Sequence, residues 1–345
     1  MRTLVFALSF FLFSLSLAQT WHPAGPESTD FSGLKHLIAV SQSEIAGLRE
    51  EAGLIFSADM GKTWSDLTLP DSLPVPDCFT SSGRKLYVGR SGREVWEWDL
   101  DQKTARRIFD LEGRSLGTMA VFHGRLIIGS FSSPDHPEAI TAIELSTLEV
   151  VPQAETPGPK EAIYALHMYG PNQSVLYAGG RKGVWEGEGG GTRWTNSFLR
   201  DQQPYKKGEI WWIDSDLTQL YAAADGGLLK GYVADGAWES VVEEGDWTGL
   251  EPDDLQYYHK RALAEGPVDR VLVREAFVVA QTSDVLRITW DKGAMWTDFL
   301  LPMGPGTLFK AGKAGFFLTT EGKLYQTPDL QLALKKWREE FLGKK

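Results

Sequence analysis

The sequence predicts an all-β protein, a single seven-bladed β-propeller with four-stranded antiparallel blades and a short C-terminal helix. Three observations predict it. Short apolar strands that end in a small residue recur at intervals of about 40 to 50 residues, which is typical of propeller blades. The 345 residues include 36 Gly and 13 Trp. Many glycines favour tight turns, and aromatic residues favour strands.

The repeat can be followed through seven copies. The small residue that closes the first apolar strand of each copy falls at Gly47, Gly89, Gly129, Gly179, Ala223, Ala280 and Thr319. Neighbouring stretches extend a copy to four strands. In the second copy, residues 78–89 supply two inner strands, and residues 93–100 and 105–111 supply two outer ones. An irregular first or last copy would reduce the count to six blades.

Two stretches share a motif at the turn between the third and fourth strands of a copy. Residues 54–64 read LIFSADMGKTW and residues 286–296 read LRITWDKGAMW. The shared positions are Ser57, Asp59, Gly61 and Trp64 in the first stretch and Thr289, Asp291, Gly293 and Trp296 in the second. A hydroxyl and a carboxylate can bind the backbone N–H groups of their own turn, and glycine permits the positive φ of a tight hairpin. We therefore interpret both motifs as structural.

These two stretches resemble Asp-boxes, which are also called BNR repeats. Such boxes occur in sialidases, sortilin-type receptors, some glycoside hydrolases and the propeller-type photosystem II assembly factors. The resemblance covers about residues 30 to 330 and implies a propeller fold. In that superfamily the boxes lie at the periphery of the blades, away from the ligand site. The resemblance therefore implies an architectural role for Asp59 and Asp291.

The two ends of the chain predict an exported protein with a helical tail. Residues 1–18 resemble a signal peptide, because Arg2 precedes an apolar run and Ala18 offers a small residue for cleavage. The remaining chain divides into a propeller domain over residues 19–330 and a helical tail over residues 331–345. In the tail, one helical face carries Leu330, Leu334, Trp337 and Phe341. We expect this face to pack on the last blade, and the mature protein to be secreted or periplasmic.

Charge and composition exclude several classes of function. The formal net charge of −11 argues against nucleic acid and against anionic membrane surfaces as partners. Cys78 is the only cysteine, so it cannot form an internal disulfide, and it is expected to be a small buried residue. The six histidines are isolated along the chain. The sequence therefore predicts no metal site and no cofactor.

Catalytic motifs are also missing from the sequence. A sialidase needs three arginines that hold a carboxylate and a Tyr-Glu pair, and the arginine motif usual in sialidases is missing before Ser57. Other glycosidases need two carboxylates about 5 to 10 Å apart. With 46 acidic residues, the sequence leaves such a pair open. Enzymatic activity is left undecided, and a non-enzymatic role is favoured.

Propeller connectivity places three long insertions on one face, and we predict the binding site there. The insertions are residues 130–139, 197–209 and 243–267. Aromatic side chains beside carboxylates suit sugar stacking or a protein hot spot. The candidate ligand-binding residues are Trp211, Trp212, Trp247, Asp253, Asp254, Tyr257, Tyr258 and His259. The alternative is that the rings of the third insertion only hold that loop on the propeller.

The favoured function is an exported, non-enzymatic scaffold, expected to be a monomer, that binds a protein or glycan ligand through this loop-rich face. The alternative is a carbohydrate-active enzyme, a glycoside hydrolase or lyase of the Asp-box type, that acts at the mouth of the channel. Converging carboxylates or arginines in a pocket would favour the enzyme. An exposed aromatic patch without them would favour binding.

Overall fold

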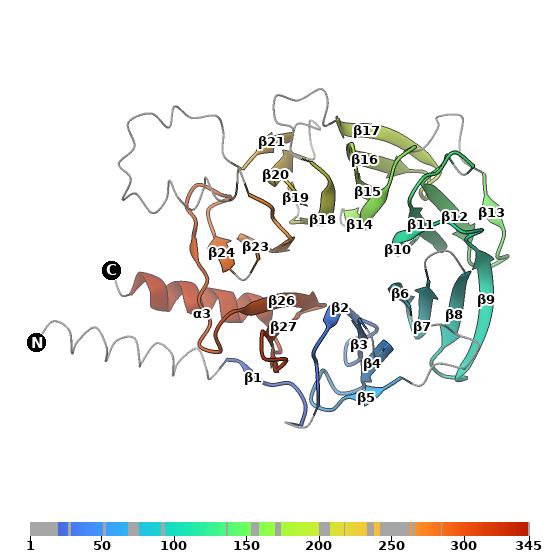
Figure 1. Cartoon of the computed structure of the whole chain (residues 1–345). Coiled ribbons are helices and arrows are strands. Elements are labelled where there is room, and N and C mark those ends of the chain that lie inside the picture. Colours follow the sequence, from blue (N-terminus) through green and yellow to red (C-terminus); the bar gives the residue numbers. More distant parts are fainter. Residues whose placement is uncertain are drawn as a thin grey trace, which may run out of the picture. The chain divides into compact units, whose positions relative to one another are not determined.

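The computed structural model describes most of the chain (Figure 1). The described residues are 20–26, 29–50, 53–67, 76–90, 94–135, 137–152, 159–169, 174–199, 208–216, 218–232, 238–241, 263, 266–283 and 285–343. The predicted signal peptide, residues 1–18, lies outside them. Among the described residues, no helix has the length and apolar character needed to span a membrane.

Seven four-stranded antiparallel sheets follow one another along the chain, and they form a seven-bladed β-propeller (Figure 1). The first sheet contains β2 (Leu34–Ala39), β3 (Ile45–Arg49), β4 (Gly53–Ser57) and β5 (Ser65–Asp66). The second contains β6 (Cys78–Ser82), β7 (Lys85–Gly89), β8 (Glu94–Asp99) and β9 (Thr104–Asp110). The third contains β10 (Leu116–Phe122), β11 (Arg125–Ser130), β12 (Ile140–Glu144) and β13 (Val150–Val151).

The next three sheets repeat this order. The fourth contains β14 (Ile163–Tyr169), β15 (Val175–Gly180), β16 (Gly183–Glu188) and β17 (Arg193–Leu199). The fifth contains β18 (Ile210–Ser215), β19 (Gln219–Ala224), β20 (Gly227–Tyr232) and β21 (Trp238–Ser240). The sixth contains β22 (Arg270–Arg274), β23 (Phe277–Thr282), β24 (Val285–Thr289) and β25 (Thr297–Asp298).

The seventh sheet takes strands from both ends of the chain. It contains β26 (Gly306–Ala311), β27 (Ala314–Thr319) and β28 (Leu324–Thr327), and its outer strand is β1 (His22–Pro23). His22 pairs with Gln326 and Pro23 with Tyr325. Proline is tolerated in such an edge strand because only one side of the strand has to form ladder hydrogen bonds.

The seven predicted copies of the repeat correspond to the seven sheets. Each of the seven small residues that mark the copies lies in the second strand of its sheet, from Gly47 in β3 to Thr319 in β27. These second strands are buried along most of their length, and every residue of β19 is buried. Strands buried on both faces have nearly continuous apolar sequences. This explains why the second strand is the clearest part of each copy.

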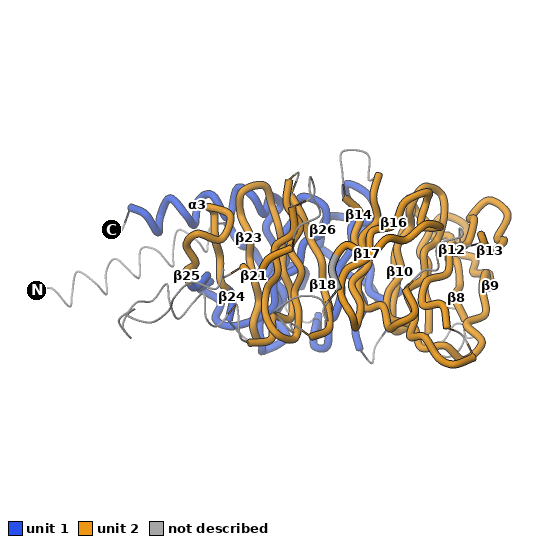
Figure 2. Tube along the Cα trace, turned by 90° about the horizontal axis from the view of Figure 1, so that it is seen from above, with its two compact units in different colours: residues 1–68, 284–286, 298–345 blue, residues 69–283, 287–297 orange. Residues whose placement is uncertain are grey.

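The chain groups into two compact units (Figure 2). Unit 1 comprises residues 1–68, 284–286 and 298–345, and unit 2 comprises residues 69–283 and 287–297. Unit 1 has a core that includes Ile45, Ile55 and Phe316. Unit 2 has several clusters between its sheets, and Trp194 and Trp296 are among their largest buried side chains. The boundaries predicted for one propeller domain, residues 19–330, stay a prediction.

The turn after β4 is held by its own side chains. The Ser57 hydroxyl donates a hydrogen bond to Asp59 at 2.9 Å and accepts one from the Gly61 N–H at 2.7 Å. Asp59 accepts hydrogen bonds from the backbone N–H and the hydroxyl of Thr63. Gly61 has φ of 87°, and a Cβ there would lie 2.5 Å from the Gln326 side chain. The turn therefore requires glycine at this position.

The turn after β24 repeats the hydrogen bonds that the first turn makes to its own backbone. The Thr289 hydroxyl donates to Asp291 at 2.7 Å and accepts from the Gly293 N–H at 3.1 Å. Asp291 accepts from the Met295 N–H at 2.9 Å. The hydroxyl and the carboxylate in both turns therefore satisfy backbone donors of the turn itself.

The C-terminal helix α3 (Leu330–Leu342) packs in unit 1. Asp329 caps it by accepting a hydrogen bond from the Leu332 N–H at 3.0 Å. Trp337 is buried, and its ring lies 5.1 Å from that of Phe299 and 5.2 Å from that of Phe341. Leu330 lies against Gly315 in β27, so this helical face is anchored to the last sheet.

Candidate functional site

A β-bulge recurs at the start of the first strand of four sheets. This first strand, such as β14 or β18, is called the inner strand of its blade. The register between the first and second strands shifts between Leu34 and His36, Leu116 and Thr118, Ile163 and Ala165, and Ile210 and Trp212. The residues skipped by the pairing are Lys35, Gly117, Tyr164 and Trp211. A bulge changes the direction in which a side chain points. In each of these blades, the same position near the start of the inner strand is therefore left out of the strand pairing.

Three aromatic side chains meet at these bulges in unit 2, and we call them the aromatic row: Phe131, Tyr164 and Trp211. The rings of Tyr164 and Trp211 lie 5.0 Å apart, centroid to centroid, with an interplanar angle of 52°. The rings of Phe131 and Tyr164 lie 5.3 Å apart at 74°. Phe131 is 38% exposed and Trp211 is 36% exposed. The row is therefore a solvent-accessible aromatic surface.

Gly117 makes room for the first ring of the row. A Cβ at this position would lie 1.9 Å from the carbonyl oxygen of Ile163 and 3.2 Å from the ring of Phe131. No side chain fits there, and the ring of Phe131 lies beside the space instead. Phe131 is held in place because its N–H donates to the Ser115 carbonyl at 2.9 Å.

The aromatic row lies at one edge of three consecutive sheets. Tyr164 and Trp211 are the second residues of inner strands β14 and β18, and Phe131 directly follows β11 (Figure 1). The start of each inner strand pairs with the end of the second strand, as Ile210 does with Ala224. The insertions at 130–139 and 197–209 join their strands at this same edge. The row therefore lies on the face for which the sequence predicts long loops.

The carboxylates beside the row have partners within the protein. Arg181 Nε lies 3.3 Å from Glu209 Oε1. Burial, together with the hydrogen bond to Glu209 and the charge of that carboxylate, raises the pKa of Tyr164 to about 12. The buried Glu161 accepts a hydrogen bond of 2.7 Å from the indole N–H of Trp185. Both carboxylates next to the row are therefore engaged in contacts within the protein.

The two adjacent tryptophans of β18 have different surroundings. Trp211 belongs to the row, whereas Trp212 packs against the core cluster that contains Val271 and Tyr221. The guanidinium of Arg270 lies 4.9 Å from the centre of the Trp212 ring. Burial lowers the pKa of Arg270 to about 10, but this value is still well above neutral pH, where the guanidinium is cationic. This geometry is a cation–π contact that holds Trp212 in place.

The structure describes only two of the eight candidate binding residues, Trp211 and Trp212. Trp247, Asp253, Asp254, Tyr257, Tyr258 and His259 lie outside the described residues. The sequence pattern did not predict Phe131 and Tyr164 as binding residues, although Phe131 lies in the predicted insertion at 130–139. A bulge is a property of strand pairing, and the local composition around Tyr164 gives no sign of it.

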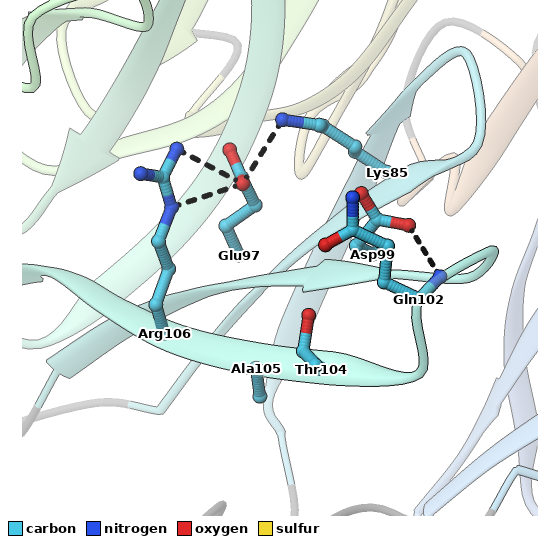
Figure 3. Close-up of a pocket in the computed structure, with 7 residues that line it drawn as sticks. All are labelled: Lys85, Glu97, Asp99, Gln102, Thr104, Ala105 and Arg106. Atoms are coloured by element: carbon cyan, nitrogen blue, oxygen red, sulfur yellow. Dashed lines mark hydrogen bonds and ion pairs between the residues drawn. The ribbon is translucent and has the colours of Figure 1, made fainter.

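The cavity shown in Figure 3 has a volume of about 340 Å³ and lies on strands β7 to β9. Its lining residues are Lys85, Glu97, Asp99, Gln102, Thr104, Ala105 and Arg106. Glu97 Oε1 lies 3.1 Å from Lys85 Nζ and 3.0 Å from Arg106 Nη2. Burial opposes ionisation, but hydrogen bonds from Arg106 and Lys85 hold the pKa of Glu97 below its usual value. The charges satisfy one another, which makes this a cross-strand structural cluster.

Metal and thiol chemistry find no support in the part of the chain that the structure describes. No group of three or more His, Cys, Asp or Glu side chains there could hold a metal ion. Cys78 packs against the cluster between the second and third sheets, and burial raises its pKa to about 12. A thiol with a raised pKa is a poor nucleophile.

Comparison with known proteins supports the fold. The sequence matches no protein-family model and no curated protein. The extracellular domain of BT4673 from B. thetaiotaomicron aligns with a TM-score of 0.64 at 11% identity, over 90% of this chain and 40% of that one. YCF48 bound to D1 peptide aligns with a TM-score of 0.61 at 15% identity, over 89% of this chain and 95% of that one. The RRP9 WD40 repeats align with a TM-score of 0.60 at 14% identity, over 90% of this chain and 98% of that one.

Proposed function

We propose that the protein is an exported, non-enzymatic β-propeller scaffold that binds a protein or glycan ligand through its loop-rich face. The observation that carries this proposal is the aromatic row. Phe131 and Trp211 expose large rings at the edge where the insertions emerge. Aromatic residues contribute much of the binding energy in protein interfaces, and loops on a rigid scaffold often carry function.

Two further observations agree with this proposal. One structural neighbour, YCF48, was solved bound to a D1 peptide, and another is an extracellular domain. Export itself rests on the signal-peptide pattern of residues 1–18. We also infer that the turns at Ser57 and Thr289 are Asp-boxes, because both make the same hydrogen bonds to the turn backbone.

The rival function, a carbohydrate-active enzyme, has weaker support at this face. Glycoside hydrolysis needs two carboxyl groups that can reach the substrate. Near the row, Glu209 is paired with Arg181, and Glu161 accepts from Trp185. Burial and Glu209 raise the pKa of Tyr164, which makes its phenol harder to ionise than that of an ordinary tyrosine. These contacts favour binding over hydrolysis.

Arrays of glycans and of peptides test the proposal with the purified protein. We expect one class of probe to bind, and Trp211→Ala and Phe131→Ala to weaken that binding by about tenfold or more, as is common for aromatic hot spots. Val150→Ala is the control, because Val150 is 53% exposed on the outer strand of the third sheet. Binding that survives both aromatic substitutions would move the site elsewhere. Turnover of a bound glycan would favour the enzyme.

A further inference from the structure

We propose that the ligand of the aromatic row is an extended peptide segment in the polyproline II conformation, rich in proline. This inference rests on the proposed function and names the ligand class for the same site. It follows from the shape of the row, the orientation of its rings and the state of the polar groups beside it.

The row is a surface and not a pocket. Two of its three residues are more than a third exposed, and none of them lines the cavity of about 340 Å³. Small ligands bind in concave sites that enclose most of their surface. An extended polymer that lies across the protein surface does not need a pocket that encloses it. The open shape of the row therefore suits such a ligand.

The rings of the row do not stack face to face. Successive rings are inclined to one another at 74° and 52°. The steps between ring centres are 5.3 and 5.0 Å. Polyproline II has three residues per turn and a rise of about 3.1 Å per residue, which is about 9 Å per turn. One turn of such a peptide is therefore about as long as the two steps taken together.

Trp211 also provides a hydrogen-bond donor. Its indole N–H makes no hydrogen bond with any of the residues that the structure describes. A polyproline II backbone has no internal hydrogen bonds, and its carbonyl groups point outward. Aromatic-lined surfaces recognise such peptides by stacking on proline rings, and the ligand loses little conformational entropy.

The polar groups beside the row favour a peptide over a glycan. A sugar presents many hydroxyl groups, and each needs a partner when it is desolvated. The carboxylates of Glu209 and Glu161 are engaged with Arg181 and Trp185. Tyr164 is hydrogen-bonded to Glu209. A proline-rich peptide needs apolar contact and few donors, which is what the row offers.

Binding of labelled decaproline tests the inference. Fluorescence anisotropy is measured with the full-length protein, with a Gly-Ser decamer and cellohexaose as the other probes. We expect decaproline to bind and the Gly-Ser decamer not to bind. Trp211→Ala should weaken binding by about tenfold or more. Trp211→Phe keeps a ring but removes the N–H, so it should weaken binding less than the alanine variant does.

Two controls keep this test interpretable. Val150→Ala should bind decaproline as the wild type does, and thermal unfolding by circular dichroism shows that each variant is folded. Absence of decaproline binding to the folded wild-type protein overturns the inference, and so does binding that Trp211→Ala and Phe131→Ala leave unchanged. If cellohexaose binds instead and these variants abolish that binding, the ligand class is wrong while the proposed site stands.

Discussion

The carboxylate of Asp214 in β18 accepts a hydrogen bond of 2.8 Å from the backbone N–H of Val273 in β22. A buried side chain therefore joins the inner strands of two consecutive blades. The same carboxylate accepts from the Ser215 N–H at 2.9 Å, and Ser215 Oγ lies 2.7 Å from His167 Nε2 in β14. This chain of contacts links three neighbouring inner strands of unit 2, among them the two that carry Tyr164 and Trp211.

Asp214→Ala should destabilise the protein. The substitution leaves the buried N–H of Val273 without its acceptor, which costs about 1 to 3 kcal/mol in the free energy of unfolding. Urea unfolding followed by circular dichroism measures this change. Asp225→Ala, which removes an exposed carboxylate from the turn after β19, is the control and should change the free energy much less. Equal effects of the two substitutions would show that the link between the blades is unimportant.

Gly117→Ala should disturb the aromatic row as well as stability. A Cβ at this position would lie 1.9 Å from the Ile163 carbonyl oxygen, so the bulges of two blades would have to separate. Such overpacking costs about 1 to 3 kcal/mol. We expect a lower melting temperature and weaker binding of any ligand that contacts Phe131. Gly343→Ala, at a glycine with φ of −67°, serves as the glycine-to-alanine control. A variant as stable as the wild type would contradict the close approach seen at Gly117.

Asp59 should stabilise the protein in a pH-dependent way. Burial opposes ionisation, but hydrogen bonds from Thr63 and Ser57 hold the pKa of Asp59 below its usual value. A lowered pKa in the folded state means that the stabilisation is present above about pH 4, the usual pKa of an unfolded aspartate. It is lost as the pH falls through the lower pKa of the folded state.

Urea unfolding of Asp59→Ala between pH 3 and pH 7 measures this contribution. The difference from the wild type should be about 1 kcal/mol near neutral pH and should shrink in acid. Asp135→Ala removes an exposed carboxylate in the 130–139 insertion and should show no such trend. A difference that stayed constant down to pH 3 would exclude this role of the carboxylate.

Export should remove residues 1–18. A signal peptidase requires small residues near the cleavage point, and Ala18 meets that requirement. Intact mass measurement of the secreted protein should therefore give an N-terminus at Gln19. Ala18→Asp should leave a longer chain, while Gln19→Asn should still be cleaved. Secretion with residue 1 retained would contradict the signal-peptide interpretation.

The number and kind of blades could be predicted from the sequence because each second strand is buried on both faces. That burial makes segments such as the one ending at Gly89 nearly continuous in apolar residues, and their spacing then gives the repeat. The loop-rich face followed from connectivity alone. The aromatic row did not, because Tyr164 and Trp211 meet only through bulges in two separate sheets. Gly117, which leaves room for Phe131, lies 14 residues before it in the chain. The close approach at Gly117 also involves Ile163 in β14, which is far away in the sequence.

The last sheet has a consequence for biosynthesis. Its outer strand β1 is supplied by residues 22–23, and its other three strands by residues 306–327. Residues 22–23 must therefore wait for residues 306–327 before this sheet is complete, and closing so long a loop is entropically unfavourable. A nascent chain on the ribosome therefore cannot complete this blade before residues 306–327 have been synthesised.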